Sequence, residues 1–222
     1  MRNLEAIFFD QDNTLFNTRE AAKEYYRAVI EWLATKVEYD PKQLYAKWQD
    51  VVNEFKTSKD PLKRSYEFSL TQTLEGLLLS KSFTKEAIER FEDFFLDNLS
   101  LNPGVRDFFS QKKTVKYVLV TESEKYLTLK KLGKFELARK FDLIVTSDET
   151  KVTKPDSRYF ELAWRELNLA PENCIYVGDN WEKDCKLGQE KGGAGVVYGG
   201  FDHRADYEIM DMRELDDIIG HI

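Results

Sequence analysis

The sequence is poor in the residues that mark secreted or thiol-dependent proteins. Only two of its 222 residues are cysteines, Cys174 and Cys185, so a disulfide framework is excluded and a reducing compartment is expected. Histidine is just as rare, with only His203 and His221, so a catalytic centre that depends on histidine is not expected. No basic segment followed by an apolar run marks a secretory signal near the N-terminus, and we therefore expect a cytoplasmic protein.

Long apolar runs and an excess of positive charge are also missing. No apolar segment approaches the roughly 18 residues that a membrane-spanning helix needs. The chain has 33 Lys and Arg against 40 Asp and Glu, a net charge of -7, so neither a nucleic acid nor a membrane surface is an expected partner. Hydrophobic residues make up 42% and charged residues 33% of the chain, a composition that favours a soluble, folded protein.

Short apolar runs rich in β-branched and aromatic residues predict buried strands. Each of four such runs ends in small or acidic polar residues: Ala6–Phe9, Tyr117–Val120, Leu143–Val145 and Cys174–Val177. A fifth run, Gly195–Tyr198, would complete the sheet, and helical patterns cover Tyr126–Lys140 and Asp156–Asn168. Strands that alternate with helices predict an α/β fold with a Rossmann-like parallel sheet.

The pattern of apolar residues changes between residues 17 and 98, where no apolar run predicts a strand. Apolar residues recur there at helical spacing, for example Leu44, Trp48, Val51 and Phe55, and Asn102–Gly104 marks the return to the α/β pattern. We therefore expect an α/β core formed by residues 1–16 and 99–222, with an α-helical cap subdomain, residues 17–98, inserted after the first strand.

Acidic side chains follow two of the predicted strands. Asp10 and Asp12 come after the first strand, and Asp179 and Asp184 come after the strand that ends at Val177. Taken singly, such aspartates are more often caps of turns or helices. The carboxyl ends of parallel strands meet at one edge of a sheet, however, and carboxylates gathered there repel one another and require a cation. Mg²⁺ is the candidate, because it binds through few carboxylates and leaves positions for water and phosphate.

Four short motifs, in this order along the chain, resemble the signatures of the haloacid dehalogenase-like hydrolase superfamily, in its branch with a helical cap after the first strand. Asp10–Leu15 resembles the DxDxT nucleophile loop, and Val118–Thr121 resembles the strand that ends in Thr or Ser. Lys154–Asp156 is similar to the third motif, and Gly178–Asp184 to the acidic fourth motif. One motif alone would be weak support, but four in order span nearly the whole chain.

The resemblance implies a phosphatase that acts on a small phosphorylated metabolite. It makes Asp10 the nucleophile that forms an aspartyl-phosphate and Asp12 the general acid and base. Mg²⁺ would be held by the Asp10 carboxylate, the Asp12 main-chain carbonyl and Asp179, with Asp184 in the same metal site, directly or through water. Thr121 and Lys154 would bind the phosphoryl oxygens. These implied roles are: catalytic, Asp10 and Asp12; phosphate-binding, Thr121 and Lys154; metal-binding, Asp10, Asp12, Asp179 and Asp184.

Asp12 favours phosphate ester hydrolysis over dehalogenation, because the resemblance implies that the haloacid dehalogenases of this superfamily lack the second aspartate. A phosphomutase of the same branch, a 2-haloacid dehalogenase and a non-catalytic binding module are the alternatives, and the chain is expected to be a monomer or a homodimer.

Two residues depart from the family pattern. Asn13 stands where Gly is frequent, and Glu122 stands after Thr121 where Asn is usual, so Glu122 would turn away from phosphate or pair with a cation such as Lys125.

Overall fold

The computed structural model describes residues 3–37, 39–58, 60–77, 81–111 and 115–221. The chain divides into two compact units. Residues 1–18 and 100–222 form the first unit, and residues 19–99 form the second.

The first unit is built on a six-stranded sheet in which every neighbouring pair of strands is parallel. The strand order is β3-β2-β1-β4-β5-β6, so the first strand of the chain lies at the centre. The strands are β1 Ala6–Phe9, β2 Lys116–Val120, β3 Leu143–Val145, β4 Cys174–Gly178, β5 Ala194–Tyr198 and β6 Tyr207–Ile209. The predicted α/β fold with a parallel sheet is confirmed.

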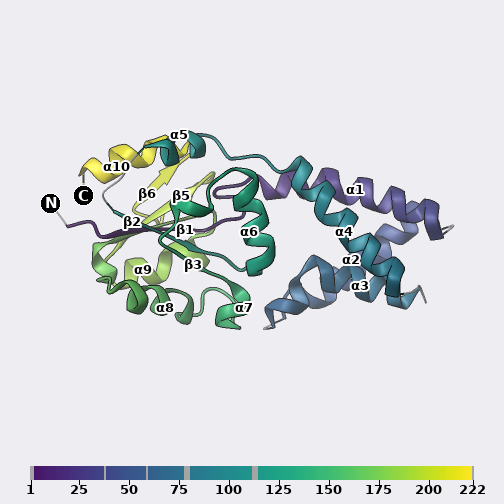
Figure 1. Ribbon diagram of the computed structural model, residues 1–222. Coiled ribbons are helices and arrows are strands. Elements are labelled where there is room, and N and C mark those ends of the chain that lie inside the picture. Colours follow the sequence, from purple (N-terminus) through teal and green to yellow (C-terminus); the bar gives the residue numbers. More distant parts are fainter. Residues whose placement is uncertain (1–2, 38, 59, 78–80, 112–114, 222) are drawn as a thin grey trace. The chain divides into compact units, whose positions relative to one another are not determined.

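Helices cover both faces of this sheet, α5 (Val105–Ser110) and α10 (Leu215–His221) on one and α8 (Arg158–Leu167) and α9 (Lys186–Glu190) on the other (Figure 1). Successive residues of β1 point to opposite faces. Phe8 stacks on Tyr176 at 4.9 Å between ring centroids, whereas Phe9 lies 5.3 Å from Phe109 of α5. All four residues of β1 are buried, which explains why its sequence is an apolar run without alternation.

Two elements of the first unit differ from the sequence-based expectation. The helix predicted over Tyr126–Lys140 is shorter in the structure, where α6 covers Lys125–Lys134. Glu136, two residues after its end, adopts a left-handed conformation with φ 60°, which does not continue an α-helix. A short 3₁₀ helix, Ala138–Lys140, follows. Strand β6 was not expected, because only one of its three residues, Ile209, is buried and the strand has no apolar run. The other helical elements are α7 Ser147–Thr150, a π-helix Trp181–Cys185 and 3₁₀ helices Pro171–Asn173 and Met212–Glu214.

In the part that the structure describes, the second unit contains helices and no named strand. Its elements are α1 Thr18–Val37 (which starts one residue inside the first unit), α2 Pro41–Phe55, a 3₁₀ helix Pro61–Arg64, α3 Tyr66–Gly76 and α4 Lys81–Asn98. Asp40 caps α2 by accepting hydrogen bonds from the main-chain N–H groups of Lys42 and Gln43. The buried Trp48 indole donates to the Ser69 hydroxyl at 2.9 Å, so the one polar atom of this core side chain is satisfied.

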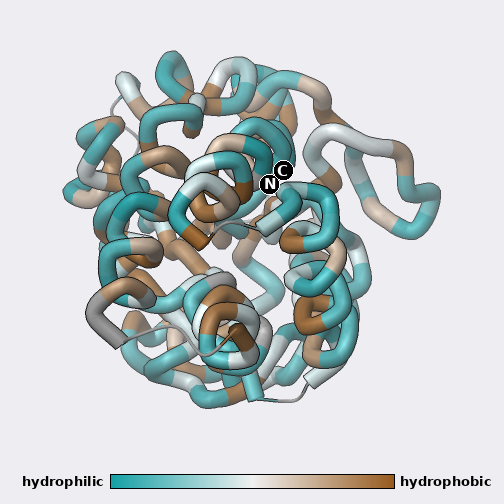
Figure 2. The backbone as a smooth tube through the Cα atoms, turned by 90° about the vertical axis from the view of Figure 1, so that its right-hand side faces the viewer, coloured by the Kyte–Doolittle hydropathy of each residue, from teal (hydrophilic) through white to brown (hydrophobic). Residues whose placement is uncertain are grey.

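Hydrophilic and hydrophobic stretches alternate along the helices, as Figure 2 shows in teal and brown. This alternation is typical of helices that bury one face and expose the other. Among the described residues, no helix combines the length and the apolar character that a crossing of the bilayer requires.

Candidate active site

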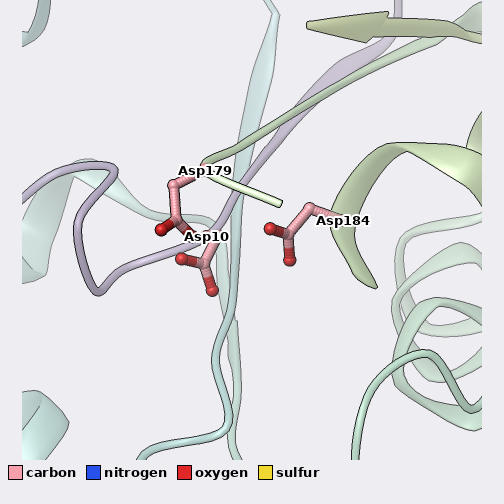
Figure 3. Close-up of side chains that lie close together, drawn as sticks. All are labelled: Asp10, Asp179 and Asp184. Atoms are coloured by element: carbon pink, nitrogen blue, oxygen red, sulfur yellow. The ribbon is translucent and has the colours of Figure 1, made fainter. Parts of the chain in front are cut away.

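Three carboxylates gather at the carboxyl ends of β1 and β4 (Figure 3). Asp10 directly follows β1 and Asp179 directly follows β4, and these two strands are neighbours in the sheet. The Asp10 main-chain N–H donates to the carbonyl of Val177 at 2.9 Å, which continues the ladder one residue past β1. One carboxylate oxygen from each of Asp10, Asp179 and Asp184 lies within 4.8 Å of the others, and we call these three carboxylates the acidic group.

The loop after β4 folds back so that Asp184 points at the strand end. Asp184 lies in the π-helix Trp181–Cys185, and its Oδ2 accepts a hydrogen bond from the Asn180 main-chain N–H at 3.1 Å. Any side chain at Gly178 would overlap the Asp184 carboxyl group, so glycine is required at the end of β4.

The Lys154 ammonium lies between two of these carboxylates. Its Nζ is 2.7 Å from Oδ1 of Asp10 and 2.7 Å from Oδ1 of Asp184, and the Lys154 side chain is only 2% exposed. Burial by itself lowers the pKa of this ammonium, but the Coulombic and hydrogen-bond contributions of the two carboxylates outweigh it, and the net pKa is raised. Lys154 is therefore a fixed positive charge inside the acidic group.

The acidic group is electrostatically strained in spite of Lys154. Burial raises the pKa of Asp10, with Lys154 opposing the shift and Asp184 adding to it. The pKa of Asp184 is raised in the same way, first by burial, with Asp179 adding to the shift. A further cation would relieve this repulsion between carboxylates.

The turn after β1 holds Asp10 from the other side. Asn13 has φ 63°, the left-handed conformation that asparagine tolerates, so it can occupy the position where the family often has glycine. The Thr14 hydroxyl donates to Oδ2 of Asp10 at 3.3 Å. The Asn102 side-chain amide donates to the carbonyls of Asn13 and Thr14 at 2.9 and 3.0 Å, which ties this turn to the chain returning from the second unit.

The carboxylate of Asp12 does not belong to the group formed by Asp10, Asp179 and Asp184 within the part of the chain that the structure describes. Its Oδ1 lies 2.6 Å from Nζ of Lys131, and its Oδ2 accepts a hydrogen bond from the Ser123 hydroxyl at 2.7 Å. Neither Lys131 nor Ser123 was expected from the sequence, where Lys131 is one of 33 basic residues and Ser123 belongs to no motif.

Thr121 lies directly after β2, at the same edge of the sheet. It is buried, its main-chain N–H donates to the carbonyl of Val145 at 3.0 Å, and its hydroxyl accepts from the Ser123 main-chain N–H at 3.1 Å. All six residues proposed for the site, Asp10, Asp12, Thr121, Lys154, Asp179 and Asp184, belong to the first unit.

The Glu122 carboxylate contacts Lys154 and Lys183 and thereby ties three loops together. Its Oε1 accepts a hydrogen bond from the Lys154 main-chain N–H at 3.1 Å, and its Oε2 lies 2.7 Å from Nζ of Lys183. The cation that pairs with Glu122 is Lys183, whereas the expected candidate, Lys125, pairs with Glu149 at 2.6 Å. Glu122 thus links the ends of β2 and β4 to the segment that carries Lys154.

The two contacts of Glu122 predict different costs for two substitutions. Glu122→Gln keeps an acceptor for the Lys154 N–H and loses the partly exposed ion pair with Lys183, so the free energy of unfolding should fall by less than about 1 kcal/mol. Glu122→Ala also leaves the Lys154 N–H without its acceptor and should cost a further ~1–2 kcal/mol. Urea denaturation measures both losses. Equal losses in the Gln and Ala variants would show that the bond to Lys154 contributes nothing.

The cysteines are unsuited to act as nucleophiles. Both are buried and free, and burial raises the pKa of the Cys174 thiol to about 12. Burial likewise raises the pKa of Cys185. A thiolate, the reactive form, is therefore disfavoured at both positions.

Comparison with known sequences gives phosphatases as relatives. A phosphorylated carbohydrates phosphatase from Thermotoga maritima is 28% identical over 179 residues, which are 80% of this chain and 77% of the relative. A glyceraldehyde 3-phosphate phosphatase from Methanopyrus kandleri is 27% identical over 221 residues, which are 97% of this chain and 91% of the relative.

Comparison with solved structures shows the same fold in the HAD-hydrolase YfnB from Bacillus subtilis, which was solved bound to magnesium. The TM-score is 0.75 at 19% identity, and the match covers 99% of this chain and 100% of that one. The family model of haloacid dehalogenase-like hydrolases matches residues 4–192, which include all four motifs. The chain therefore belongs to the haloacid dehalogenase-like hydrolase family.

Proposed function

We propose that this protein is a Mg²⁺-dependent phosphatase that hydrolyses a phosphorylated sugar or a similar small metabolite through an aspartyl-phosphate on Asp10. The observation that carries this proposal is the arrangement around Asp10. Its carboxylate lies within 4.8 Å of those of Asp179 and Asp184, it contacts the Lys154 ammonium at 2.7 Å, and Asp12 follows two residues later. In the proposed mechanism this arrangement would supply a nucleophile and a cation site, with the second carboxylate for proton transfer two residues further along the chain.

The chemistry of the acidic group fits a bound divalent cation. All three side chains offer carboxylate oxygens, the ligands that Mg²⁺ prefers. Lys154 neutralises one of the three charges, which leaves two for a divalent ion to balance. The solved relative of this fold that is bound to magnesium supports the same choice of ion. Asp10, Asp179 and Asp184 would hold the ion, with the main-chain carbonyl of Asp12 as a further ligand, and the ion would offset the negative charge that builds up on the phosphoryl group.

In the first step, an oxygen of the Asp10 carboxylate attacks phosphorus and the bond from phosphorus to the substrate's alcohol oxygen breaks. Asp12 donates a proton to that oxygen, so the product leaves as a neutral alcohol. Lys154, held against Asp10, and Thr121, at the end of β2, bind the phosphoryl oxygens during the transfer.

In the second step, water attacks the phosphorus of the aspartyl-phosphate. Asp12, now ionised, accepts the proton of the attacking water, and the bond between phosphorus and the Asp10 oxygen breaks. Inorganic phosphate leaves and Asp10 is restored, so the net reaction consumes one water for each ester bond.

The helical second unit is the proposed cap that selects the substrate. It is inserted in the chain between β1 and β2, and the named relatives act on phosphorylated carbohydrates and glyceraldehyde 3-phosphate, which favours small sugar phosphates as the substrate class.

The direct test incubates the purified protein with Mg²⁺ and a panel of sugar phosphates, and measures inorganic phosphate and the dephosphorylated sugar. Equal amounts of both products are expected. Transfer of the phosphoryl group to another hydroxyl group of the sugar, without release of inorganic phosphate, would make the protein a mutase. Chloride release from chloroacetate in EDTA would make it a dehalogenase. A folded protein without turnover on any of these compounds would make it a binding module.

Metal dependence gives a second test that does not rely on activity alone. Mg²⁺ at about 100 times its Kd should raise the free energy of unfolding by about 2.7 kcal/mol, which thermal denaturation detects. Asp179→Asn should abolish this gain, whereas Glu89→Gln in α4 should retain it. EDTA should stop hydrolysis of p-nitrophenyl phosphate, and added Mg²⁺ should restore it. Hydrolysis that persists in EDTA would overturn the metal assignment.

A further inference from the structure

The Asp12 carboxylate is fixed by contacts to both of its oxygens. Oδ1 lies 2.6 Å from Nζ of Lys131, and Oδ2 accepts from the Ser123 hydroxyl at 2.7 Å. Lys131 also donates to the Ser123 hydroxyl at 3.2 Å and to Oε1 of Gln11 at 3.5 Å. The carboxylate, the ammonium and the hydroxyl therefore form a closed triangle of contacts, and Asp12 cannot rotate its carboxylate without breaking at least one of them.

Lys131 is an unusual residue to find at this position. It lies on α6, whose other lysines include exposed ones, yet its own side chain is only 3% exposed while the Asp12 side chain is 32% exposed. Burying an ammonium is costly unless it is paired and hydrogen-bonded. Lys131 contacts, at 2.6 Å, the carboxylate to which we assign proton transfer.

Ser123 connects the triangle to the predicted phosphate site. Its main-chain N–H donates to the hydroxyl of Thr121 at 3.1 Å, so Ser123 is fixed by the residue that ends β2. A hydroxyl can donate a hydrogen bond to a carboxylate or accept one from a carboxylic acid. The contact between Ser123 and Asp12 can thus persist through both protonation states of an acid–base cycle.

We propose that Lys131 and Ser123 are positioning residues that hold the Asp12 carboxylate in the orientation needed for proton transfer. This proposal rests on the proposed function, in which Asp12 protonates the leaving alcohol. Misplacement of a reacting group by about 1 Å can cost about 100-fold in rate, so loss of either contact slows the proton transfer without removing the acid itself.

The test compares two substrates that differ in their need for a proton. An alkyl phosphate, such as glycerol 3-phosphate, must be protonated as its alcohol leaves, whereas nitrophenolate leaves p-nitrophenyl phosphate as a stable anion. The parameter to measure is kcat/KM, because it includes only the steps up to the release of the alcohol and not the hydrolysis of the aspartyl-phosphate. A general acid contributes about 10²–10⁴-fold to such a step.

Lys131→Met is expected to lower kcat/KM by about 30-fold or more for the alkyl phosphate and by less than about 3-fold for p-nitrophenyl phosphate. Ser123→Ala should show the same imbalance, a larger loss of kcat/KM for the alkyl phosphate than for p-nitrophenyl phosphate, but with smaller losses. It keeps the test available if the lysine variant does not fold. Lys131→Arg, which retains the charge, should recover part of the loss. Lys134→Met, at the exposed end of the same helix, is the matched control and should leave both substrates unchanged.

Asp12→Asn, measured in parallel, separates this proposal from the function on which it rests. If Asp12→Asn shows the imbalance while Lys131→Met and Ser123→Ala reduce both substrates equally or not at all, the positioning role is wrong and the acid role of Asp12 stands. If Asp12→Asn itself shows no imbalance, the assignment of Asp12 as the acid fails, and the positioning role fails with it.

Discussion

Replacing Asp10 by asparagine is expected to reduce hydrolysis of p-nitrophenyl phosphate by at least about 10³-fold, the scale at which the loss of a nucleophile affects a covalent mechanism. The amide of asparagine has the shape of the carboxylate but does not attack phosphorus. The measurement is steady-state release of nitrophenol in Mg²⁺, with the variant purified free of wild-type protein.

The fold of this variant should be intact. Folding raises the pKa of Asp10 in the metal-free protein, chiefly through burial, so the ionised carboxylate is less stable there than it would be in water. A neutral isostere avoids that cost, and the melting temperature without metal should stay the same or rise at neutral pH. Glu89→Gln on α4 serves as the control and should leave both activity and melting temperature unchanged. Retention of most of the activity in Asp10→Asn would exclude Asp10 as the nucleophile.

The second large effect is expected from Lys154→Met, which should lower both activity and stability. Lys154 contacts Asp10 and Asp184 at 2.7 Å each, and its removal leaves buried carboxylates without their internal cation. Loss of one partner from a buried ion pair costs about 3–5 kcal/mol, and loss of a charged phosphate contact costs about 10²–10³-fold in kcat. Chemical denaturation and steady-state kinetics measure these two losses.

The stability loss in Lys154→Met should depend on pH with a definite sign. Folding raises the pKa values of Asp10 and Asp184, and removal of Lys154 raises them further, because Lys154 opposes the shift in both groups. When folding raises the pKa of a carboxyl group, the free energy of unfolding of the protein falls as the pH rises towards that raised pKa. The penalty should therefore be larger at pH 7.5 than near pH 4, where the carboxyl groups are protonated.

Two further variants make the interpretation of Lys154→Met specific. The double variant Lys154→Met with Asp184→Asn also removes the buried negative charge of Asp184, which has lost its contact with Lys154, and it should recover part of the lost stability at neutral pH. Lys85→Met, on the exposed surface of α4, should change neither stability nor activity. A pH-independent loss that the double variant does not recover would show that Lys154 acts through packing rather than through its charge.

The sequence by itself determined the α/β fold and the gathering of acidic residues after β1 and β4. Buried parallel strands read as apolar runs, and the polar residue after each run marks the edge at which such strands end together. This is why Asp10 and Asp179, which are far apart in the chain, could be expected at the same place, where their carboxylates lie within 4.8 Å of each other. The same reasoning missed β6, which has only one buried residue, and extended α6 past the left-handed Glu136.

Only the tertiary structure decided which cations serve which carboxylates. Lys131 contacts Asp12 across 119 positions of sequence, and Lys154 contacts Asp10 across 144, whereas Glu122 pairs with Lys183 rather than with the nearby Lys125. Sequence spacing fixes neighbours only within one helix or one strand. A buried ion pair instead depends on where separate loops converge, and a lysine carries no local mark that distinguishes a buried ammonium from a solvated one.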